Sequence, residues 1–257
     1  MSVTRSLKER LRRDGKVFGP MIFEFFSPGM PAIVAGSGAD FILFDMEHTG
    51  LGYETLKHMI AGCRGLDVAP LVRVPTSEYH FIARALDLGA HGIMVPMVES
   101  RAQAEHIAAC AHYPPFGRRG AAFGVAHDGY RAQPIATMEI ARERTLVIAQ
   151  IETATGLENV EEIAAAEGVD VIWLGHFDLT NFLGIPGQFQ NPIYLSAVKR
   201  IVEAAKASKK VAGFLVPDDK WATEYWEHGF RMIGVGPDHV LFQSALAQRL
   251  AFLKSQA

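Results

Sequence analysis

The chain alternates between short apolar runs and longer stretches in which apolar residues recur every three or four positions. Short apolar runs are typical of buried β-strands, and the longer pattern is typical of amphipathic helices. Glycine or proline often separates the two and marks the joins between elements. Eight runs are predicted as strands: residues 19–25, 41–47, 69–74, 92–96, 145–152, 169–174, 211–216 and 232–235.

A helical pattern follows each predicted strand, over residues 27–38, 54–64, 81–88, 101–111, 157–166, 194–208, 220–228 and 239–254. Apolar strands that alternate with helices indicate a parallel sheet covered on both faces. Because eight such units occur in 257 residues, we expect one domain over residues 1–257, an α/β fold closed into a (β/α)8 TIM barrel. An open, doubly wound sheet is the alternative.

Three segments do not fit the simple alternation. The charged N-terminal segment predicts a short amphipathic helix, with Leu7 and Leu11 on one side, that covers an end of the domain. Residues 112–144 and 175–193 form long connections, and long loops inside a domain tend to be functional. Loops that leave the C-terminal ends of barrel strands form the active-site face.

Composition narrows the classes of function. Hydrophobic residues make up 49% of the chain, which permits a large core, and the net charge of -3 makes nucleic acid an unexpected partner. No apolar stretch reaches the roughly 18 residues that a membrane span needs, and no secretory signal is apparent, so we expect a cytoplasmic protein. Cys63 and Cys110 lie among small apolar residues and are expected to be buried, unpaired thiols.

Polar residues gather where the predicted strands end. Each strand is otherwise apolar, so a polar group there is costly unless it has a partner or a function. Since parallel strands end at the same face of a barrel, these side chains should lie close together. They are Asp45, Glu47 and His48 after the second strand, Arg73 after the third, Gln150 and Glu152 after the fifth, and Asp178 after the sixth.

Glu152 and Asp178 are the candidate metal ligands. Two carboxylates that converge repel each other unless they share a cation or a proton. Mg²⁺ binds one or two carboxylates and completes its shell with water and substrate oxygens. The alternative is that Glu152 caps the following helix and that Asp178 caps or turns its loop. No cysteine or paired-histidine motif is present, so a zinc site is not expected.

Arg73 and His48 are the other candidates. An arginine amid buried strand residues either forms a structural ion pair or holds a substrate carboxylate or developing oxyanion. Asp45 and Glu47 should lie on one face of their strand, and Asp45 is expected to orient the His48 ring as a general base. The alternative for His48 is an ordinary surface histidine.

Six strings carry a more specific signal: FDMEH, LVRVP, MVPMVES, HYPPFGRRGAA, AQIETATGLENV and GHFDLTNFLGIPGQF. In order, and over nearly the whole chain, they resemble the 4-hydroxy-2-oxoheptanedioate aldolase family. These class II pyruvate aldolases are related to 2-dehydro-3-deoxyglucarate aldolase and to the citrate lyase β-subunit. The resemblance implies a barrel assembled as a homo-hexamer, or trimer of dimers, with the last helix exchanged between neighbours. It also implies a divalent metal (Mg²⁺, Mn²⁺ or Co²⁺) and no organic cofactor.

The resemblance also assigns roles to individual residues. It implies metal ligands at Glu152 and Asp178, a catalytic His48 with Asp45 as its partner, Arg73 on the pyruvyl oxygen, Gln150 beside the metal, backbone donors to the substrate carboxylate at Gly175, His176 and Phe177, and a covering loop at Arg119 and Gly120. The chain departs from the family at His176 and Phe177, where Pro-Ala is usual, and at Pro237, where a small polar residue is usual. His176 either meets the substrate or packs within the loop.

The implied reaction splits the C3–C4 bond of a 4-hydroxy-2-oxo acid. The products are pyruvate, or a related 2-oxo acid such as hydroxypyruvate, and an aldehyde. No lysine lies at a predicted strand end, so a Schiff-base aldolase lacks support. The alternatives are a lyase acting on a CoA thioester, with Arg118, Arg119 and Arg131 as its candidate basic residues, and a barrel that has lost turnover.

Overall fold

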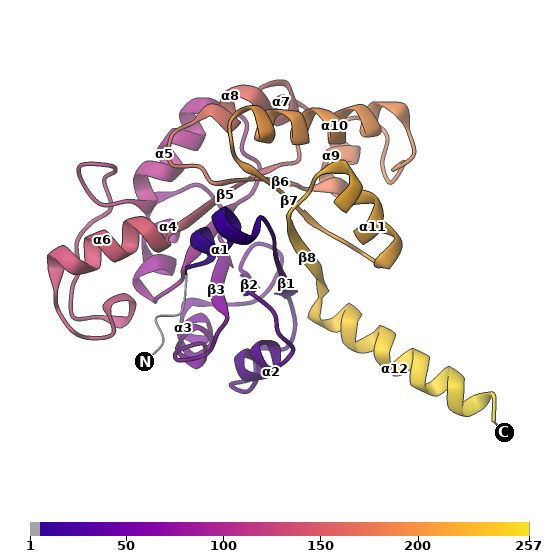
Figure 1. Ribbon diagram of the computed structural model, residues 1–257, viewed down its shortest axis with the longest axis horizontal. Coiled ribbons are helices and arrows are strands. Elements are labelled where there is room, and N and C mark those ends of the chain that lie inside the picture. The colour runs from indigo at the N-terminus through magenta and orange to yellow at the C-terminus, as the bar shows by residue number, and fades with distance from the viewer. Residues whose placement is uncertain (1–5, 257) are drawn as a thin grey trace.

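Eight parallel strands close into a barrel in the computed structural model, which describes residues 6–256 (Figure 1). Each strand pairs with its neighbours in sequence, and the last pairs with the first. The predicted (β/α)8 fold is therefore confirmed, and the open sheet is wrong. The strands are β1 Val17–Ile22, β2 Phe41–Asp45, β3 Ala69–Arg73, β4 Gly92–Val95, β5 Leu146–Ile151, β6 Val171–Leu174, β7 Val211–Leu215 and β8 Met232–Pro237.

Helices surround the barrel, and most of the predicted ones are present. They are α1 Leu7–Asp14, α2 Met30–Gly36, α3 Tyr53–Gly62, α4 Tyr79–Asp87, α5 Arg101–Ala111, α6 Pro134–Arg144, α7 Ala154–Glu158, α8 Val160–Ala165, α9 His176–Phe182, α10 Pro192–Ala207, α11 Asp219–His228 and α12 Asp238–Lys254, with a short 3-10 helix, η1, at Ala126–Asp128. The helix predicted over 157–166 is two helices that meet at Asn159.

Alternation along the strands separates two apolar layers. Leu43, Leu71 and Ile148 belong to the cluster that fills the barrel interior. The residues next to them belong to the outer layer that packs against the helices. Because side chains alternate along a strand, this phase turns Asp45, Arg73 and Gln150 inward at the C-terminal ends. The same phase that builds the core therefore places polar groups at the mouth of the barrel.

The first strand ends earlier than predicted. It covers Val17–Ile22 rather than residues 19–25. The carboxylate of Asp238, at the start of α12, accepts hydrogen bonds from the amides of Phe23 (2.9 Å), Glu24 (3.2 Å) and Phe25 (2.7 Å). Because these amides donate to a side chain and not to a neighbouring strand, the segment after Ile22 does not continue the sheet.

The two long connections are only partly loops, which corrects their description as loops throughout. Residues 112–144 contain η1 and α6, and α6 begins at Pro134, a residue that suits the first helical turn. Residues 175–193 contain α9, which starts directly after β6. Asp178 therefore lies in the first turn of a helix and not in an irregular loop.

The N-terminal helix α1 covers one end of the barrel, as predicted. Leu7 and Leu11 are buried in the interior cluster, and Lys8 forms an ion pair with Asp170 at 2.9 Å. Cys63 and Cys110 are buried and unpaired, which confirms that expectation. Across residues 6–256, no helix is both long and apolar enough to span a bilayer.

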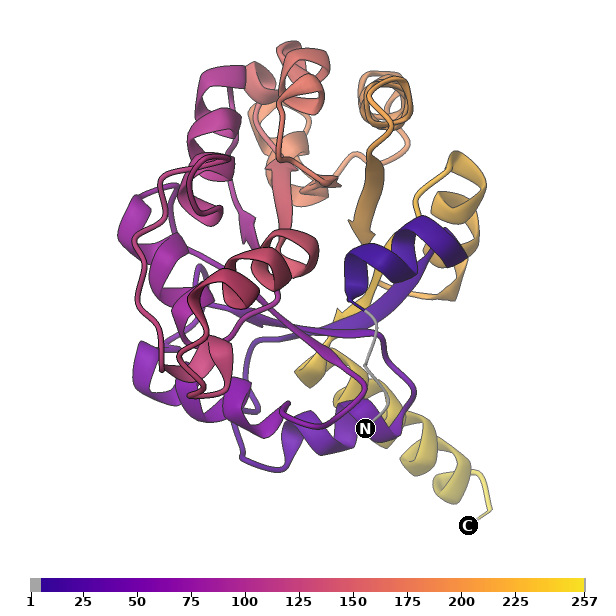
Figure 2. The same ribbon diagram turned by 60° about the vertical axis from the view of Figure 1, so that its left-hand side comes forward.

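The C-terminal helix α12 projects away from the barrel (Figures 1 and 2). Apolar side chains along it are exposed, among them Phe242, Leu246, Leu250, Phe252 and Leu253. At its base, β1, α2 and the first turns of α12 border an apolar cavity of about 780 Å³.

Candidate active site

Arg73 is the centre of an ion-pair network at the mouth of the barrel. Its Nε donates to Asp45 Oδ1 at 2.5 Å, and its Nη1 lies 3.0 Å from Glu47 Oε2. Asp45 and Arg73 are partners in the register of β2 and β3, and both side chains are almost fully buried. The guanidinium also lies over the Phe23 ring at 5.6 Å. Of the two alternatives for Arg73, the structure shows the ion pair. Asp45 and Glu47 share one face of their strand as predicted.

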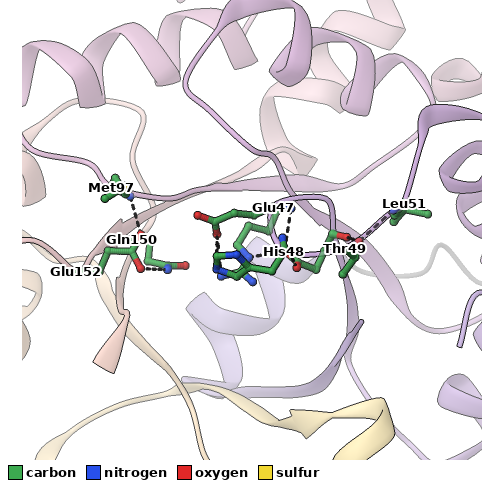
Figure 3. Close-up of polar contacts among 9 residues, drawn as sticks. Glu47, His48, Thr49, Leu51, Met97, Gln150 and Glu152 are labelled. Carbon is green, nitrogen blue, oxygen red and sulfur yellow. Dashed lines mark hydrogen bonds and ion pairs between the residues drawn. The ribbon is translucent and has the colours of Figure 1, made fainter. Parts of the chain in front are cut away.

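Glu152 is held in place by two donors on its two oxygens (Figure 3). The Met97 amide donates to Oε1 at 2.7 Å, and the Gln150 side-chain amide donates to Oε2. Met97 has a φ of 51°, an uncommon value for a residue other than glycine. Gly175 borders the same carboxylate, because a Cβ atom there would lie 2.4 Å from Glu152 Oε2. The close approach of β6 to Glu152 thus requires glycine at this position.

The charges at the mouth do not balance. The charges of Asp45, Glu152 and Asp178 act on Glu47, and that of Asp178 also acts on Glu152. Arg73 is the one cation that opposes these shifts. Burial raises the pKa of Glu47 to about 7; Arg73 opposes this shift, and the other three carboxylates add to it. Burial likewise raises the pKa of Glu152, against its two hydrogen bonds, and Asp178 raises it further. This excess of negative charge favours a bound cation.

The His48 ring does not pair with Asp45, which corrects the predicted dyad. Asp45 accepts hydrogen bonds from the backbone amides of Glu47 and His48 and is occupied by Arg73. The ring of His48 instead has its Nε2 3.6 Å from Glu47 Oε2, and its side chain is 56% exposed (Figure 3). The alternation of side chains along β2 explains this arrangement, because it points Asp45 into the barrel toward Arg73. Glu47 is the carboxylate next to the imidazole.

Asp178 faces this cluster from the first turn of α9, since its charge acts on both Glu47 and Glu152. Among residues 6–256, no group of three or more His, Cys, Asp or Glu is arranged to hold a metal ion. A cation on Glu152 and Asp178 would therefore take its remaining ligands from water or substrate, which is how Mg²⁺ is usually bound. The buried Oε1 of Gln150, which has no hydrogen-bond partner, is a further oxygen beside Glu152.

His176 packs among aromatic rings. Its centroid lies 5.0 Å from that of Phe214, 5.6 Å from Phe189 and 5.7 Å from Trp221. Burial lowers the pKa of His176 to about 4. Of the two expectations for this residue, the structure supports packing. The adjacent Phe177 is 60% exposed. Of the two residues that replace the usual Pro-Ala, Phe177 is therefore the one that adds bulk at the surface.

Arg119 does not join the cluster in this chain. Its buried guanidinium donates to Asp87 Oδ1 at 2.5 Å, at the end of α4, and lies 4.7 Å above the Tyr113 ring. The Gly120 amide donates to the hydroxyl of Tyr79, the first residue of α4. The segment therefore runs along α4. The expectation that Arg119 contacts the substrate is not met within one chain, because its guanidinium is paired with the carboxylate of Asp87.

Two contributors were missed from the sequence. Glu47 was placed at the mouth but given no role, although its spacing from Asp45 already put both on one face. The Met97 amide could not be found, because nothing in MVPMVES signals a backbone donor aimed at Glu152.

Comparison with known proteins supports the fold and the class of chemistry. Residues 21–245 match the HpcH/HpaI aldolase/citrate lyase family. The chain is 31% identical over 253 residues to 2-keto-3-deoxy-L-rhamnonate aldolase of Shigella sonnei, covering 98% of this chain and 94% of that protein.

Solved structures agree. An HpcH/HpaI aldolase/citrate lyase family protein from Burkholderia cenocepacia superposes with a TM-score of 0.90 at 31% identity, over 96% of this chain and 98% of that one. The citrate synthase SbnG superposes with a TM-score of 0.87 at 33% identity, over 98% of both chains. The chain therefore belongs to the HpcH/HpaI aldolase/citrate lyase family, whose class II aldolases are carbon–carbon lyases, as the motifs predicted.

Proposed function

We propose that this protein splits the C3–C4 bond of a 4-hydroxy-2-oxo acid and releases pyruvate, or a related 2-oxo acid, and an aldehyde. The observation that carries the proposal is the charge arrangement at the barrel mouth. Asp45 and Glu47 pair with the one buried guanidinium of Arg73, and the charges of Glu152 and Asp178 act on the same cluster. These last two, the candidate metal ligands, follow neighbouring strands. That arrangement suits a cation that itself binds an anionic 2-oxo acid.

Class II aldolases of this family generally use a divalent metal. Glu152 and Asp178 would hold it, as Mg²⁺, Mn²⁺ or Co²⁺. Burial and the charge of Asp178 raise the pKa of Glu152, and a bound cation would favour its ionised form. Once bound, such an ion supplies Lewis-acid stabilisation of the negative charge that develops on the 2-oxo oxygen. Gln150 and the Met97 amide orient Glu152 for this role.

The chain's own residues then divide the remaining work. Arg73, already fixed by Asp45 and Glu47, offers a preorganised positive charge to the same oxygen. His48 is the candidate to take the proton of the 4-hydroxyl, because its exposed ring stands beside Glu47 at the mouth. Backbone amides at His176 and Phe177, where α9 begins, are candidates to bind the carboxylate of the acid. The Gly175 amide already donates to the carbonyl of Ile151 at 3.0 Å.

The aldehyde half would occupy a cavity of about 730 Å³ next to His48. It is lined by Phe23, Glu24, Phe26, His48, Thr49, Gly50 and His239. The name of the Shigella sonnei relative makes a 2-keto-3-deoxy sugar acid the first substrate to test. The mixed aromatic and polar lining also calls for less polar tails in the same panel.

A panel of 4-hydroxy-2-oxo acids with varied tails tests the proposal, with pyruvate release as the readout. We expect activity with at least one acid, its loss in excess EDTA, and its recovery with Mn²⁺ or Mg²⁺. Full activity in chelator would rule out the metal-dependent mechanism. Cleavage of a CoA thioester, with no 4-hydroxy-2-oxo acid accepted, would favour the lyase alternative.

We further propose that the protein is a homo-hexamer in which α12 packs on a neighbouring chain. The exposed apolar side chains of α12 and the apolar cavity at its base support this, because a monomer would leave both in water. Light scattering should give about 169 kDa, six chains of 28.2 kDa each. Replacing Phe252 and Leu253 by Glu should lower that mass, whereas the exposed Gln248→Glu should not. A monomeric wild-type protein would exclude the assembly.

A further inference from the structure

A second cavity lies at the opposite end of the barrel. Its volume is about 640 Å³. Its lining includes residues that precede or begin strands: Asp40 before β2, Pro70 in β3, His91 before β4 and Arg144 before β5. These positions mark the N-terminal face, away from the strand ends that form the candidate active site. Glu152 is eight positions after Arg144, with the six residues of β5 between them, which is roughly 26 Å at the usual rise of a strand.

Arg144 is a largely buried arginine without a carboxylate partner in the described chain. Its Nη2 donates to the His127 carbonyl at 3.3 Å, and its buried Nε has no partner. Burial and the charge of Arg119 lower the pKa of Arg144, Tyr113 opposes them, and no carboxylate is among the causes. Arg73 and Arg119, by contrast, each pair with a carboxylate. An uncompensated charge of this kind is costly to bury.

Unsatisfied polar atoms concentrate around this guanidinium. In residues 6–256, eight buried side-chain nitrogen or oxygen atoms lack a hydrogen-bond partner, and five of them belong to Tyr113, Arg119, His127, Arg144 and Thr145. These residues are neighbours in sequence or contact one another through the bonds and ring contacts around Arg119 and His127. Of these five residues, His127 and Arg144 line the cavity. Buried polar atoms normally find a protein, water or ligand partner, so the unpaired atoms of these two residues require an explanation.

Carboxylates also line the cavity, but each of them is either paired with another arginine or exposed. Asp40 and Asp67 both pair with Arg10, and the exposed Glu143 pairs with Arg12 at 3.4 Å. Glu9 and Glu139 are exposed to solvent. Solvent screens such groups, whereas the field of a buried guanidinium is screened much less. Arg144 therefore keeps a positive charge that none of these carboxylates pairs with in the described chain.

We propose that this cavity binds a small oxyanion, a carboxylate or a phosphate, through the guanidinium of Arg144. The anion would accept hydrogen bonds from the guanidinium and from the His91 ring, which lines the same wall and feels the charge of Arg144. The cavity is large enough for an anion of several heavy atoms. Binding here would be independent of the aldolase reaction, because none of these residues belongs to the candidate active site.

Thermal unfolding of the full chain, titrated with inorganic phosphate, with succinate and with chloride at matched ionic strength, tests the proposal. For the wild type we expect a saturable rise of the unfolding midpoint with phosphate or succinate, beyond that with chloride. Whichever probe acts at lower concentration identifies the class of anion. The Arg144→Gln variant should bind at least tenfold more weakly, whereas Arg142→Gln, an exposed arginine on the same helix, should respond like the wild type.

Two outcomes overturn the proposal. If neither phosphate nor succinate acts beyond chloride, water alone satisfies the cavity. If Arg144→Gln responds as the wild type does, the anion binds elsewhere, for instance at Arg73. Should Arg144→Gln fail to fold, His91→Gln provides the second variant, and an unchanged response in it would equally contradict the assignment. No turnover is measured, so the result does not depend on the proposed aldolase activity.

Discussion

Two buried arginines lie at opposite ends of the same barrel in contrasting surroundings. Arg73, at the C-terminal end, contacts two carboxylates and lies within a group of four. Arg144, at the N-terminal end, has no acidic partner in the described chain and contacts a carbonyl. Both are held beside strand termini, so the contrast comes from their neighbours rather than from their place in the fold.

The contrast shows what each end can bind. Around Arg73 the negative charge exceeds the positive, so a cation lowers the cost of burial. Around Arg144 a positive charge is left uncompensated, so a bound anion would lower the cost of burying it. A buried group of either sign indicates the sign of its missing partner, which is more informative than the presence of a charged residue alone.

The largest effect is expected for Glu152→Gln. The substitution keeps the shape of the side chain but removes one of the two carboxylates proposed to hold the metal. We expect kcat/KM for pyruvate release to fall about a thousandfold, the scale of several kcal/mol of lost transition-state stabilisation. Calorimetric titration with Mn²⁺ should show weaker binding. Glu158→Gln, an exposed residue of α7, is the control and should stay near wild type. Wild-type Mn²⁺ affinity in Glu152→Gln would remove this residue from the metal site.

The next effect compares the two arginines directly. Arg73→Met leaves Asp45 buried without its partner, so the free energy of unfolding should fall by about 3–5 kcal/mol. Arg144→Met breaks no ion pair and should change it by less than about 1 kcal/mol in a buffer without polyvalent anions. Urea denaturation at pH 7 measures both. Equal losses would mean that Arg144 has a structural partner after all, and the contrast between the two ends would disappear.

A smaller effect concerns pH at the N-terminal end. Burial, followed by the charge of Arg144, lowers the pKa of His91 to about 3 from 6.5. Between these values the unfolded chain binds the extra proton and the folded chain does not, so stability falls as pH drops below 6.5 and is constant above it. At pH 5 the loss due to His91 is about 2 kcal/mol. His91→Gln should show less loss of stability between pH 7 and 5. A variant with the wild-type slope would assign the dependence to other groups.

The barrel could be predicted from the sequence because its cause is local. Apolar strands alternate with amphipathic helices, and that pattern survives in every segment. The errors lie where distant residues intervene. Asp238, more than 200 positions away in sequence, binds the amides that would have extended β1. No periodicity in residues 19–25 could reveal that contact.

The residues that make up the site could be predicted from the sequence, but the contacts between their side chains could be predicted only in part. Strand alternation and chain direction were enough to bring Asp45, Arg73 and Glu152 to one mouth. Which carboxylate each cation contacts depends on side-chain rotamers and the turn after β2, so the His48 partner was wrong. The pairing of Arg119 with Asp87 likewise required the path of a loop along α4.

The smallest effect is expected for His176→Phe. The imidazole is buried among Phe189, Phe214 and Trp221, and its pKa of about 4 keeps it uncharged at neutral pH. A ring of similar size that needs no polar partner should fit there, so kcat/KM for pyruvate release should stay within about threefold of wild type, with an unchanged profile between pH 6 and 8. The exposed Phe177 is the matched contrast, since Phe177→Ala should alter which tails are accepted. A hundredfold loss in His176→Phe with the fold intact would mean that this imidazole reaches the substrate, and that the C-terminal end of the barrel uses a second histidine.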